Sequence, residues 1–195
     1  MAPVTEPPPA ARQAQGLQAQ ARDTLQRLAD IERRLAAAED QLAIYQLLMA
    51  YGPAADSGSD DVVLALHHQD AEYDSQLEMF RGGPAVAEMI ASLPLHRDIM
   101  RGGSSHLATM PVVRIDGDKA YAVCHGQLLR YDKDADSFRV WRATAVVLEF
   151  SRTPDGWKIY RRANRLLDGS EASHQHMRAG LAAVGAVPAA GNAAP

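Results

Sequence analysis

Apolar residues between positions 17 and 50 recur at alternating steps of three and four, in a stretch without Gly or Pro. The stretch is rich in Ala, Leu, Gln, Glu and Arg, which favour helices. Its apolar seam consists of Leu28, Ile31, Leu35, Ala38, Leu42, Tyr45 and Met49. This heptad pattern predicts one long helix, with residues 42–50 packed on a domain and residues 17–41 forming an extension suited to self-association. Gly52-Pro53 is expected to bend or reset the helix, because Pro removes a backbone donor.

The next stretch predicts two shorter helices and one strand. Residues 60–68 follow a Ser at the favourable N-cap position and carry several apolar side chains. Residues 71–75 have the composition of a short strand. A Gly-Gly turn and a Pro then introduce a helix at 84–93, since Pro suits the first helical position. Residues 97–105 contain Gly and Ser and are expected to form a loop.

Beyond residue 105 the pattern becomes that of strands. Segments rich in β-branched and aromatic residues occupy positions 106–115, 120–131, 138–152 and 157–167. Asp, Gly and Pro in their connections favour tight turns. Helices first and hairpin-joined strands afterwards indicate an α+β domain, with about three helices packed on one face of a curved, mainly antiparallel sheet.

Composition adds limits on class and location. The 195 residues suit one domain with appendages, and a net charge of −4 without a long Lys/Arg block argues against a nucleic-acid partner. The sequence shows no secretory signal and no run of ~18 apolar residues, so we expect a cytoplasmic protein without a membrane partner. The single Cys124 excludes an intrachain disulfide. Residues 1–16 and 171–195 are expected to be tails, disordered at 1–16 and from about residue 180.

A few polar residues stand where chemistry is possible, although each has a plainer structural role. Asp56 follows the first helix, where a carboxylate is typically a turn or cap residue, and His106 at a strand start is typically structural or exposed. Tyr51, five residues before Asp56, would by itself be a packing residue. The His pairs at 67–68 and at 174 and 176 lack partners at metal-ligand spacing, so no metal site is expected.

The last predicted strand carries a further polar group. Alternation with period two places Tyr160, Arg162 and Asn164 on one face of this strand. Arg161 and Arg165 lie on the other face, and a final strand with three arginines usually exposes them. Alternation alone therefore leaves a functional role for Arg162 open.

Five blocks of the sequence resemble SnoaL-like enzymes of the NTF2-like (ketosteroid-isomerase-like) superfamily. They are residues 43–56, the segment Leu66–Tyr73 with its Asp-Ala-Glu-Tyr end, Gly83-Pro84, the strand and turn His106–Asp118, and the hairpin Asp155–Ile159. The resemblance runs from about residue 40 to 168. It implies an NTF2-like cone over residues 42–170, in which the sheet wraps around the helices.

The sequence is most similar to the lyase branch of that superfamily, which includes hexachlorocyclohexane dehydrochlorinase, scytalone dehydratase and bile-acid 7α-dehydratase. This likeness implies that Asp56 and His106 form a catalytic dyad inside the cone. It also implies that Tyr51 donates a proton or hydrogen bond to a leaving oxygen and that Arg162 holds an anionic or phenolic group. Neither a cofactor nor a metal is implied.

The resemblance also suggests a substrate site. Tyr73, Tyr160 and Asn164 are expected to contact the substrate. Met110 stands where the family commonly has Asn, four residues after the His, and is expected to make the cavity more apolar. The substrate implied is therefore a small hydrophobic molecule, aromatic or polycyclic.

The activity implied is a cofactor-independent lyase that removes a proton and expels water, halide or a small carbonyl fragment. An isomerase, a polyketide cyclase and an epoxide hydrolase remain alternatives, and a non-catalytic ligand-binding or assembly module is the alternative from a different class. The lyase branch implies a homo-oligomer, a trimer in preference to a dimer, formed through the outer face of the sheet. The heptad seam adds a second possible contact.

Overall fold

The computed structural model describes residues 8–186, and the chain divides between Asp40 and Gln41 into two compact units. Helix α1 (Pro9–Ser57) supplies the described part of the first unit and the first residues of the second. It begins at Pro9, so residues 9–16 are helical and the disordered tail expected over 1–16 is wrong for that part. Pro is favourable at the first helical position, and the Ala, Gln and Arg residues that follow propagate a helix.

The end of α1 also differs from the prediction at Gly52-Pro53. The helix continues through Pro53 to Ser57. Tyr51, Ala54 and Ala55 are buried on either side of the proline. The packing of these side chains outweighs the backbone hydrogen bond that Pro53 removes, because tertiary contacts supply most of the stability of a helix in a protein.

The stripe of α1 that packs on the domain is not the heptad seam. Ile44, Leu48 and Tyr51 are buried against the domain core. The exposed seam residues are Leu28, Ile31, Leu35, Leu42 and Met49. Residues 42–50 do pack on the domain as predicted, but through positions offset from the seam. Self-association through the seam stays a prediction.

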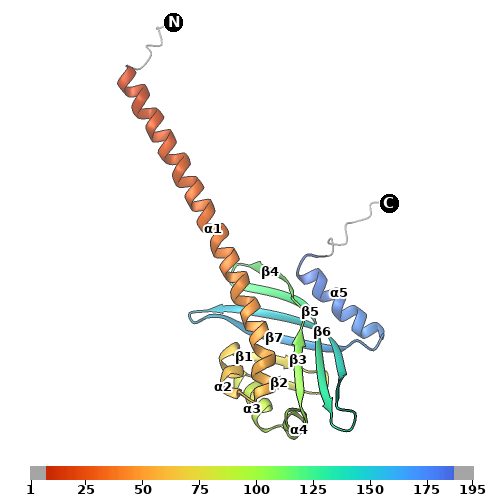
Figure 1. The fold of residues 1–195 in the computed structure, drawn as a ribbon. Helices are drawn as coiled ribbons and strands as arrows, with labels where there is room; N and C mark the ends of the chain where they lie inside the picture. Colours follow the sequence, from red (N-terminus) through yellow and green to blue (C-terminus); the bar gives the residue numbers. More distant parts are fainter. Residues whose placement is uncertain (1–7, 187–195) are drawn as a thin grey trace, which may run out of the picture. The chain divides into compact units, whose positions relative to one another are not determined.

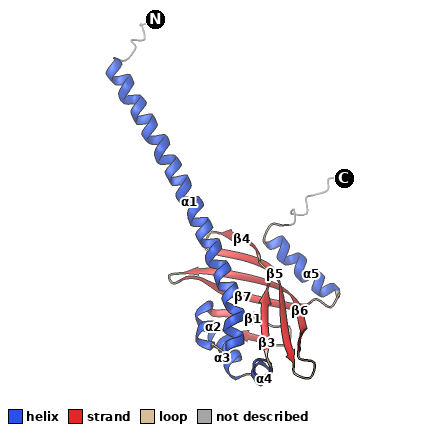
Figure 2. Cartoon of the chain, viewed as in Figure 1, coloured by secondary structure: helices blue, strands red, loops and turns tan. Residues whose placement is uncertain are grey.

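The second unit is built around one seven-stranded sheet (Figures 1 and 2). Its strands are β1 (His67–Asp74), β2 (Met79–Arg81), β3 (Ser104–Ala108), β4 (Val112–Asp116), β5 (Lys119–Asp132), β6 (Ser137–Thr153) and β7 (Gly156–Leu166). The order is β2-β1-β7-β6-β5-β3, with β4 also paired to β5. Every pairing is antiparallel except β1 with β7. The α+β class and the mainly antiparallel sheet are therefore confirmed.

Four further helices follow α1 in the described part of the chain, and two of them were not predicted. They are α2 (Asp60–Leu66), α3 (Gly83–Ser92), α4 (Pro94–Gly102) and α5 (Glu171–Ala183). α4 replaces most of the loop expected at 97–105: a Pro starts it, and Gly103, at φ 92°, ends it. α5 lies in the expected tail and is capped by Ser170, whose hydroxyl accepts a hydrogen bond from the Ser173 amide.

The sheet packs on both faces. The inner face, including Cys124, Val146 and Leu148, belongs to the same core cluster as the buried stripe of α1. On the outer face α5 approaches so closely that a Cβ at Gly180 would lie 2.7 Å from Val147 and 2.9 Å from Val123. Figure 1 shows α2, α3 and α4 beside the last turns of α1, away from α5. The helices other than α5 therefore surround the inner face, where the cavity lies.

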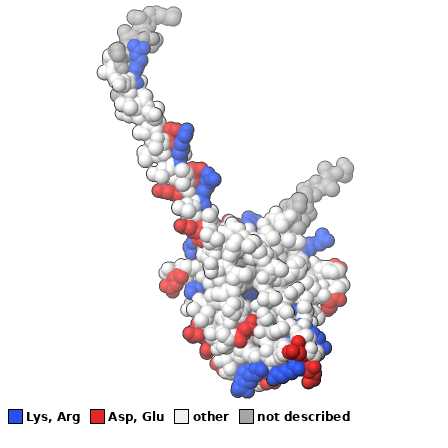
Figure 3. Space-filling view, viewed as in Figure 1, with Lys and Arg blue, Asp and Glu red and all other residues white. Residues whose placement is uncertain are grey.

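On the face of the molecule seen in Figure 3, charged side chains of both signs are interspersed. In the view of Figure 3 acidic and basic groups alternate around the domain, and an uncharged area lies between them. Ion pairs such as Arg165 with Asp74, at 2.6 Å, tie opposite charges together. Within the described residues, none of the helices combines the length and apolarity needed to cross a membrane.

Candidate active site

A cavity of about 420 Å³ opens between the helices and the inner face of the sheet. α1, α3 and α4 contribute one side, and strands β1, β3, β5, β6 and β7 contribute the other. Most of the lining side chains are apolar, with a few polar groups among them. This composition and this volume are typical of a site for a small organic molecule.

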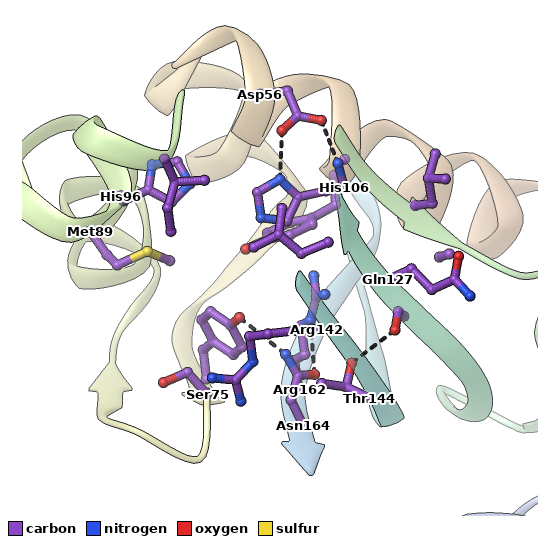
Figure 4. A pocket seen from close by; sticks show the side chains of 18 of the residues that line it. Asp56, Ser75, Met89, His96, His106, Gln127, Arg142, Thr144, Arg162 and Asn164 are labelled. Carbon is purple, nitrogen blue, oxygen red and sulfur yellow. Dashed lines mark hydrogen bonds and ion pairs between the residues drawn. The ribbon is translucent and has the colours of Figure 1, made fainter. Parts of the chain in front are cut away.

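Asp56 and His106 line one corner of the cavity (Figure 4), which together with the neighbouring Ser104 we call the dyad corner. The Oδ1 atom of Asp56 accepts hydrogen bonds from His106 Nδ1 at 2.6 Å and from the Ser104 hydroxyl at 2.7 Å. Its Oδ2 atom accepts a third from the His106 backbone amide at 2.6 Å. Because Nδ1 is engaged by the carboxylate, Nε2 is the nitrogen of His106 left to act on a ligand. The structure thus brings the two side chains of the expected dyad into contact, and their catalytic role stays a prediction.

A glycine on α1 permits this contact. Gly52 lies one helical turn before Asp56, and a Cβ there would stand 2.4 Å from the His106 carbonyl oxygen. That separation is less than any real Cβ contact, and the obstructing atom is backbone. The bare Cα of Gly52 therefore lets α1 touch β3 at the point where Asp56 must reach His106.

The dyad corner is tuned so that the carboxylate is charged and the imidazole is neutral. Burial alone would raise the pKa of Asp56, but the hydrogen bonds from His106 and Ser104 outweigh it and hold this pKa below its usual value. Burial lowers the pKa of His106, and the nearby Arg162 acts in the same direction, while Asp56 opposes both. A neutral imidazole beside a carboxylate is the arrangement of a general base.

A second polar group, which we call the arginine corner, comprises Arg162, Tyr51, Tyr73 and Asn164. The Arg162 guanidinium carbon lies 3.9 Å from the centre of the Tyr51 ring and 5.3 Å from that of Tyr73. Asn164 accepts from Arg162 Nε at 3.4 Å and donates to the Tyr73 hydroxyl at 3.2 Å. All four side chains are buried and line the cavity. The sequence predicted a catalytic role for Tyr51 and Arg162 and substrate contact for Tyr73 and Asn164; the structure brings the four side chains together, and their roles stay predictions.

Charge in the arginine corner is not neutralised by a carboxylate. The Nη1 atom of Arg162 is buried and has no hydrogen-bond partner among the described residues. Burial would lower the pKa of Arg162, but the Tyr51 and Tyr73 hydroxyls act in the opposite direction, and the pKa stays above its usual value. Burial raises the pKa of Tyr51, so the phenol keeps its proton and is a hydrogen-bond donor.

Two expected substrate contacts lie elsewhere. Tyr160 is 38% exposed and packs edge-on against His68, outside the cavity. A β-bulge between Glu149 and Phe150 shifts the pairing of β6 with β7 at this point, so Tyr160 does not share a face with Arg162. Met110 is 77% exposed in the segment between β3 and β4, so it does not make the cavity more apolar.

The structure adds two polar groups that sequence reasoning missed. His96, on α4, is buried, lines the cavity and stacks on His106 with ring centres 5.9 Å apart. Arg142, on β6, is half-buried and lines the opposite wall (Figure 4). His96 lies just before the loop expected at 97–105, and α4, which positions it, is not among the predicted helices. Arg142 had a signal, because it alternates with the buried residues Thr144 and Val146 along β6.

Candidate metal ligands are scattered rather than gathered. Among residues 8–186, no group of three or more His, Cys, Asp or Glu side chains is arranged to hold a metal ion. The histidines of the two close pairs have other contacts: His67 lies 2.7 Å from the Val63 carbonyl, and His176 lies 3.1 Å from the Ala163 carbonyl. Besides the two corners, the ionisable groups that line the cavity are His96, Arg142 and Glu78, and its uncharged polar groups include Ser75, Ser105, Gln127 and Thr144.

Comparison with known proteins agrees with this architecture. Residues 36–163 match the model of the SnoaL-like domain. An NTF2-like protein with a cystatin-like fold from Novosphingobium aromaticivorans is 35% identical, with 77% of this chain and 96% of that chain covered and a TM-score of 0.73. A second protein from the same organism, described as a candidate aromatic ring hydroxylase, is 26% identical over 67% of this chain and 90% of its own, with a TM-score of 0.55.

More distant structures share the fold alone. The protein Rv3472 of Mycobacterium tuberculosis, of unknown function, is 15% identical over 77% of this chain and 91% of its own, with a TM-score of 0.59. Among proteins with curated functions, no match was found. The family model covers well over half of the chain, and its fold carries isomerases, dehydratases and cyclases. From its sequence, its NTF2-like fold and its cavity, the chain belongs to the SnoaL-like domain family.

Proposed function

We propose that this protein is a cofactor-independent lyase that eliminates water or halide from a small hydrophobic, ring-bearing molecule. The observation that carries the proposal is the 2.6 Å contact between Asp56 and His106 Nδ1 at the wall of an apolar cavity. A histidine oriented by a carboxylate, with a lowered pKa and one free ring nitrogen, is suited to removing a proton from carbon.

The reaction balances with the residues present. His106 Nε2 takes the proton from a carbon next to the one that bears the leaving group, and the electrons of that C–H bond form the new double bond. The bond to the leaving group breaks with its electron pair. For a hydroxyl, the His106 imidazolium returns the proton to the departing oxygen, so water is released and His106 becomes neutral again. Asp56 stays ionised and stabilises the imidazolium, as the acid does in a Ser-His-Asp triad.

The arginine corner supplies the stabilisation that this reaction needs. Removal of a proton from carbon and departure of a leaving group both build negative charge on the substrate. Arg162 is a cation at the cavity wall that no carboxylate of residues 8–186 pairs, and the Tyr51 phenol keeps its proton. A cation and a hydrogen-bond donor that are fixed before the reaction lower the energy of such charge in a site sheltered from water.

A substrate screen with matched variants tests the proposal. Purified full-length protein is incubated with hydroxylated and halogenated cyclic compounds, and products are followed by ultraviolet absorbance of the new double bond and by mass. For a substrate that turns over, His106→Ala should lower kcat/KM by ~10²–10⁴-fold, the usual worth of general acid–base catalysis. The control His174→Ala, on the exposed face of α5, should leave it unchanged. Near-full turnover by His106→Ala would refute the mechanism.

A further inference from the structure

Three arginines of the sheet, Arg130, Arg142 and Arg162, have no ion pair within residues 8–186. Arg130 lies over the Trp141 ring, and Arg162 contacts Asn164 and two tyrosine rings, so Arg142 is the one of the three without a side-chain partner among those residues. Arg161 pairs with Glu149 and Arg165 pairs with Asp74, at 3.4 and 2.6 Å, and Arg139 pairs with Asp132. Arg142 makes no ion pair and no side-chain hydrogen bond to any residue in the range 8–186, although it is half-buried and lines the cavity. A charge that is partly removed from water without a counter-charge is costly, and a bound anion would remove that cost.

The strand register fixes where this charge lies relative to the dyad. His106 on β3 is opposite Leu128 on β5, and Leu128 is opposite Arg142 on β6. Residues directly opposite in antiparallel strands point to the same face, so the three side chains form one row on the inner face. Neighbouring strands are about 4.8 Å apart, which puts the Cα atoms of His106 and Arg142 roughly 10 Å apart. Both side chains line the cavity, with Leu128 between them.

The next row of the sheet leaves room for a ligand between the two side chains. It consists of Ala108, Gly126 and Thr144, which are also in register across the same three strands and also line the cavity. None of the three has a long side chain, although the space directly over Gly126 is taken by the Thr144 hydroxyl and a Val146 methyl group, each 2.9 Å from where a Cβ would stand. Small side chains therefore floor a slot next to the row that runs from His106 to Arg142.

The other charges of the cavity do not neutralise Arg142. Asp56 is already engaged by His106 and Ser104. Glu78 lies exposed at the mouth, and it makes no ion pair in the described part of the chain. Arg162 adds a second positive charge on the same cavity wall. The sheet side of the cavity thus offers positive charge to a ligand and lacks a matching carboxylate.

We propose that the substrate is an organic acid whose carboxylate binds Arg142, while its ring lies against the row of Ala108, Gly126 and Thr144 and its reacting carbon faces His106 Nε2. This inference rests on the proposed function for the identity of the reacting end, but the binding of the acid group does not depend on catalysis. A carboxylate suits Arg142 because a guanidinium pairs with its two oxygens through two parallel hydrogen bonds. Because the Cα atoms of His106 and Arg142 are roughly 10 Å apart, about one ring system fits between the carboxylate and the reacting carbon of the substrate.

Isothermal titration of the full-length protein with 2-naphthoate and its neutral counterpart 2-naphthamide tests the inference. The wild type should bind the acid at least about 10-fold more tightly than the amide, and Arg142→Gln should weaken binding of the acid by about 10–100-fold, the range of a charge-assisted hydrogen bond. Arg142→Lys should lose less, because it keeps the charge. Arg139→Gln, on the same strand but outside the cavity, is the matched control and should bind as the wild type does.

Three results would overturn the inference: no measurable binding of 2-naphthoate, equal binding of acid and amide, or a loss of acid binding in Arg162→Gln but not in Arg142→Gln. His106→Ala separates the two proposals, because it should bind 2-naphthoate normally while turnover is lost. If turnover survives in His106→Ala and Arg142→Gln still loses 2-naphthoate, the elimination mechanism fails and acid recognition stands.

Discussion

At the dyad corner both carboxylate oxygens of Asp56 accept hydrogen bonds, whereas at the arginine corner Arg162 faces two phenol rings and an amide. In the first corner the negative charge of Asp56 is matched by three hydrogen-bond donors, one of which is the imidazole of His106. The second is incomplete, because its buried cation has no carboxylate beside it in residues 8–186. Complete pairing orients a base, and incomplete pairing leaves a place for negative charge that arises on a substrate.

The largest expected effect comes from removing the negative charge of Asp56 at the dyad corner. Asp56→Asn offers one acceptor oxygen to the three donors that the carboxylate accepts. It also removes the charge that fixes the His106 tautomer, and the corresponding change in a Ser-His-Asp triad costs ~10⁴ in kcat. We expect kcat to fall by ~10³–10⁴-fold with a smaller change in KM, measured on a substrate found by the screen.

The control for this prediction is Asp74→Asn, which removes a carboxylate paired with Arg165 outside the cavity. It should change kcat little. If Asp56→Asn and Asp74→Asn had similar kcat values, the carboxylate of Asp56 would have no role beyond structure.

A second prediction concerns His67, which packs edge-on against Tyr51 of the arginine corner. Burial lowers its pKa from 6.5 to about 4, and Arg162 adds to the effect. The unfolded chain therefore binds a proton more readily than the folded one. The stability that His67 contributes is complete above pH ~6.5 and is lost as the pH falls toward ~4, by about 3 kcal/mol for a difference of this size.

Urea unfolding of the wild type and of His67→Gln at several pH values measures this loss. His96, His106 and His176 also have lowered pKa values and act in the same direction, so only the difference between the two proteins reports on His67. The slope of unfolding free energy against pH should be shallower in His67→Gln. Parallel curves would mean that His67 has an ordinary pKa in the folded protein.

The smallest expected effect is on stability at the arginine corner. Arg162→Met replaces a buried cation without a carboxylate partner by an apolar side chain of similar length. Because desolvation of the charge costs free energy that no ion pair returns, the free energy of unfolding should stay within about 1 kcal/mol of the wild type. Urea unfolding at neutral pH gives the value. If the free energy of unfolding fell by 3 kcal/mol or more, Arg162 would be a structural part of a stabilising network rather than a cation reserved for a charged substrate.

Sequence reasoning reached the dyad through the family resemblance, because Asp56 and His106 are distant in the chain and carry no mutual signal. It failed for Tyr160 because a bulge changes the alternation of β7, and a bulge is set by the pairing of two strands rather than by either strand alone. It failed for Met110 because the segment after β3 turns away from the cavity.

For the helices too, local signals in the sequence predict where an element lies but not what it packs against. The pattern of α1 was recognised, but the stripe it buries was not, since Ile44 and Leu48 pack against a domain that the helical repeat does not encode. Pro94 and Gly103 mark the ends of α4, and these local signals were available in the sequence. These signals predict a helix that includes His96, but the stacking of His96 on His106 depends on the tertiary fold.

Gly52 gives the dyad a requirement that its chemistry does not suggest. Glycine in a helix interior costs about 1 kcal/mol relative to alanine, so this position is unfavourable for α1 taken alone. Glycine is nevertheless required here, because a Cβ would lie 2.4 Å from the His106 carbonyl oxygen and would push α1 and β3 apart. A search for relatives with the same chemistry should therefore require three residues, Gly52, Asp56 and His106, rather than two. A sequence with the acid and the base but with alanine in place of the glycine would be a false positive.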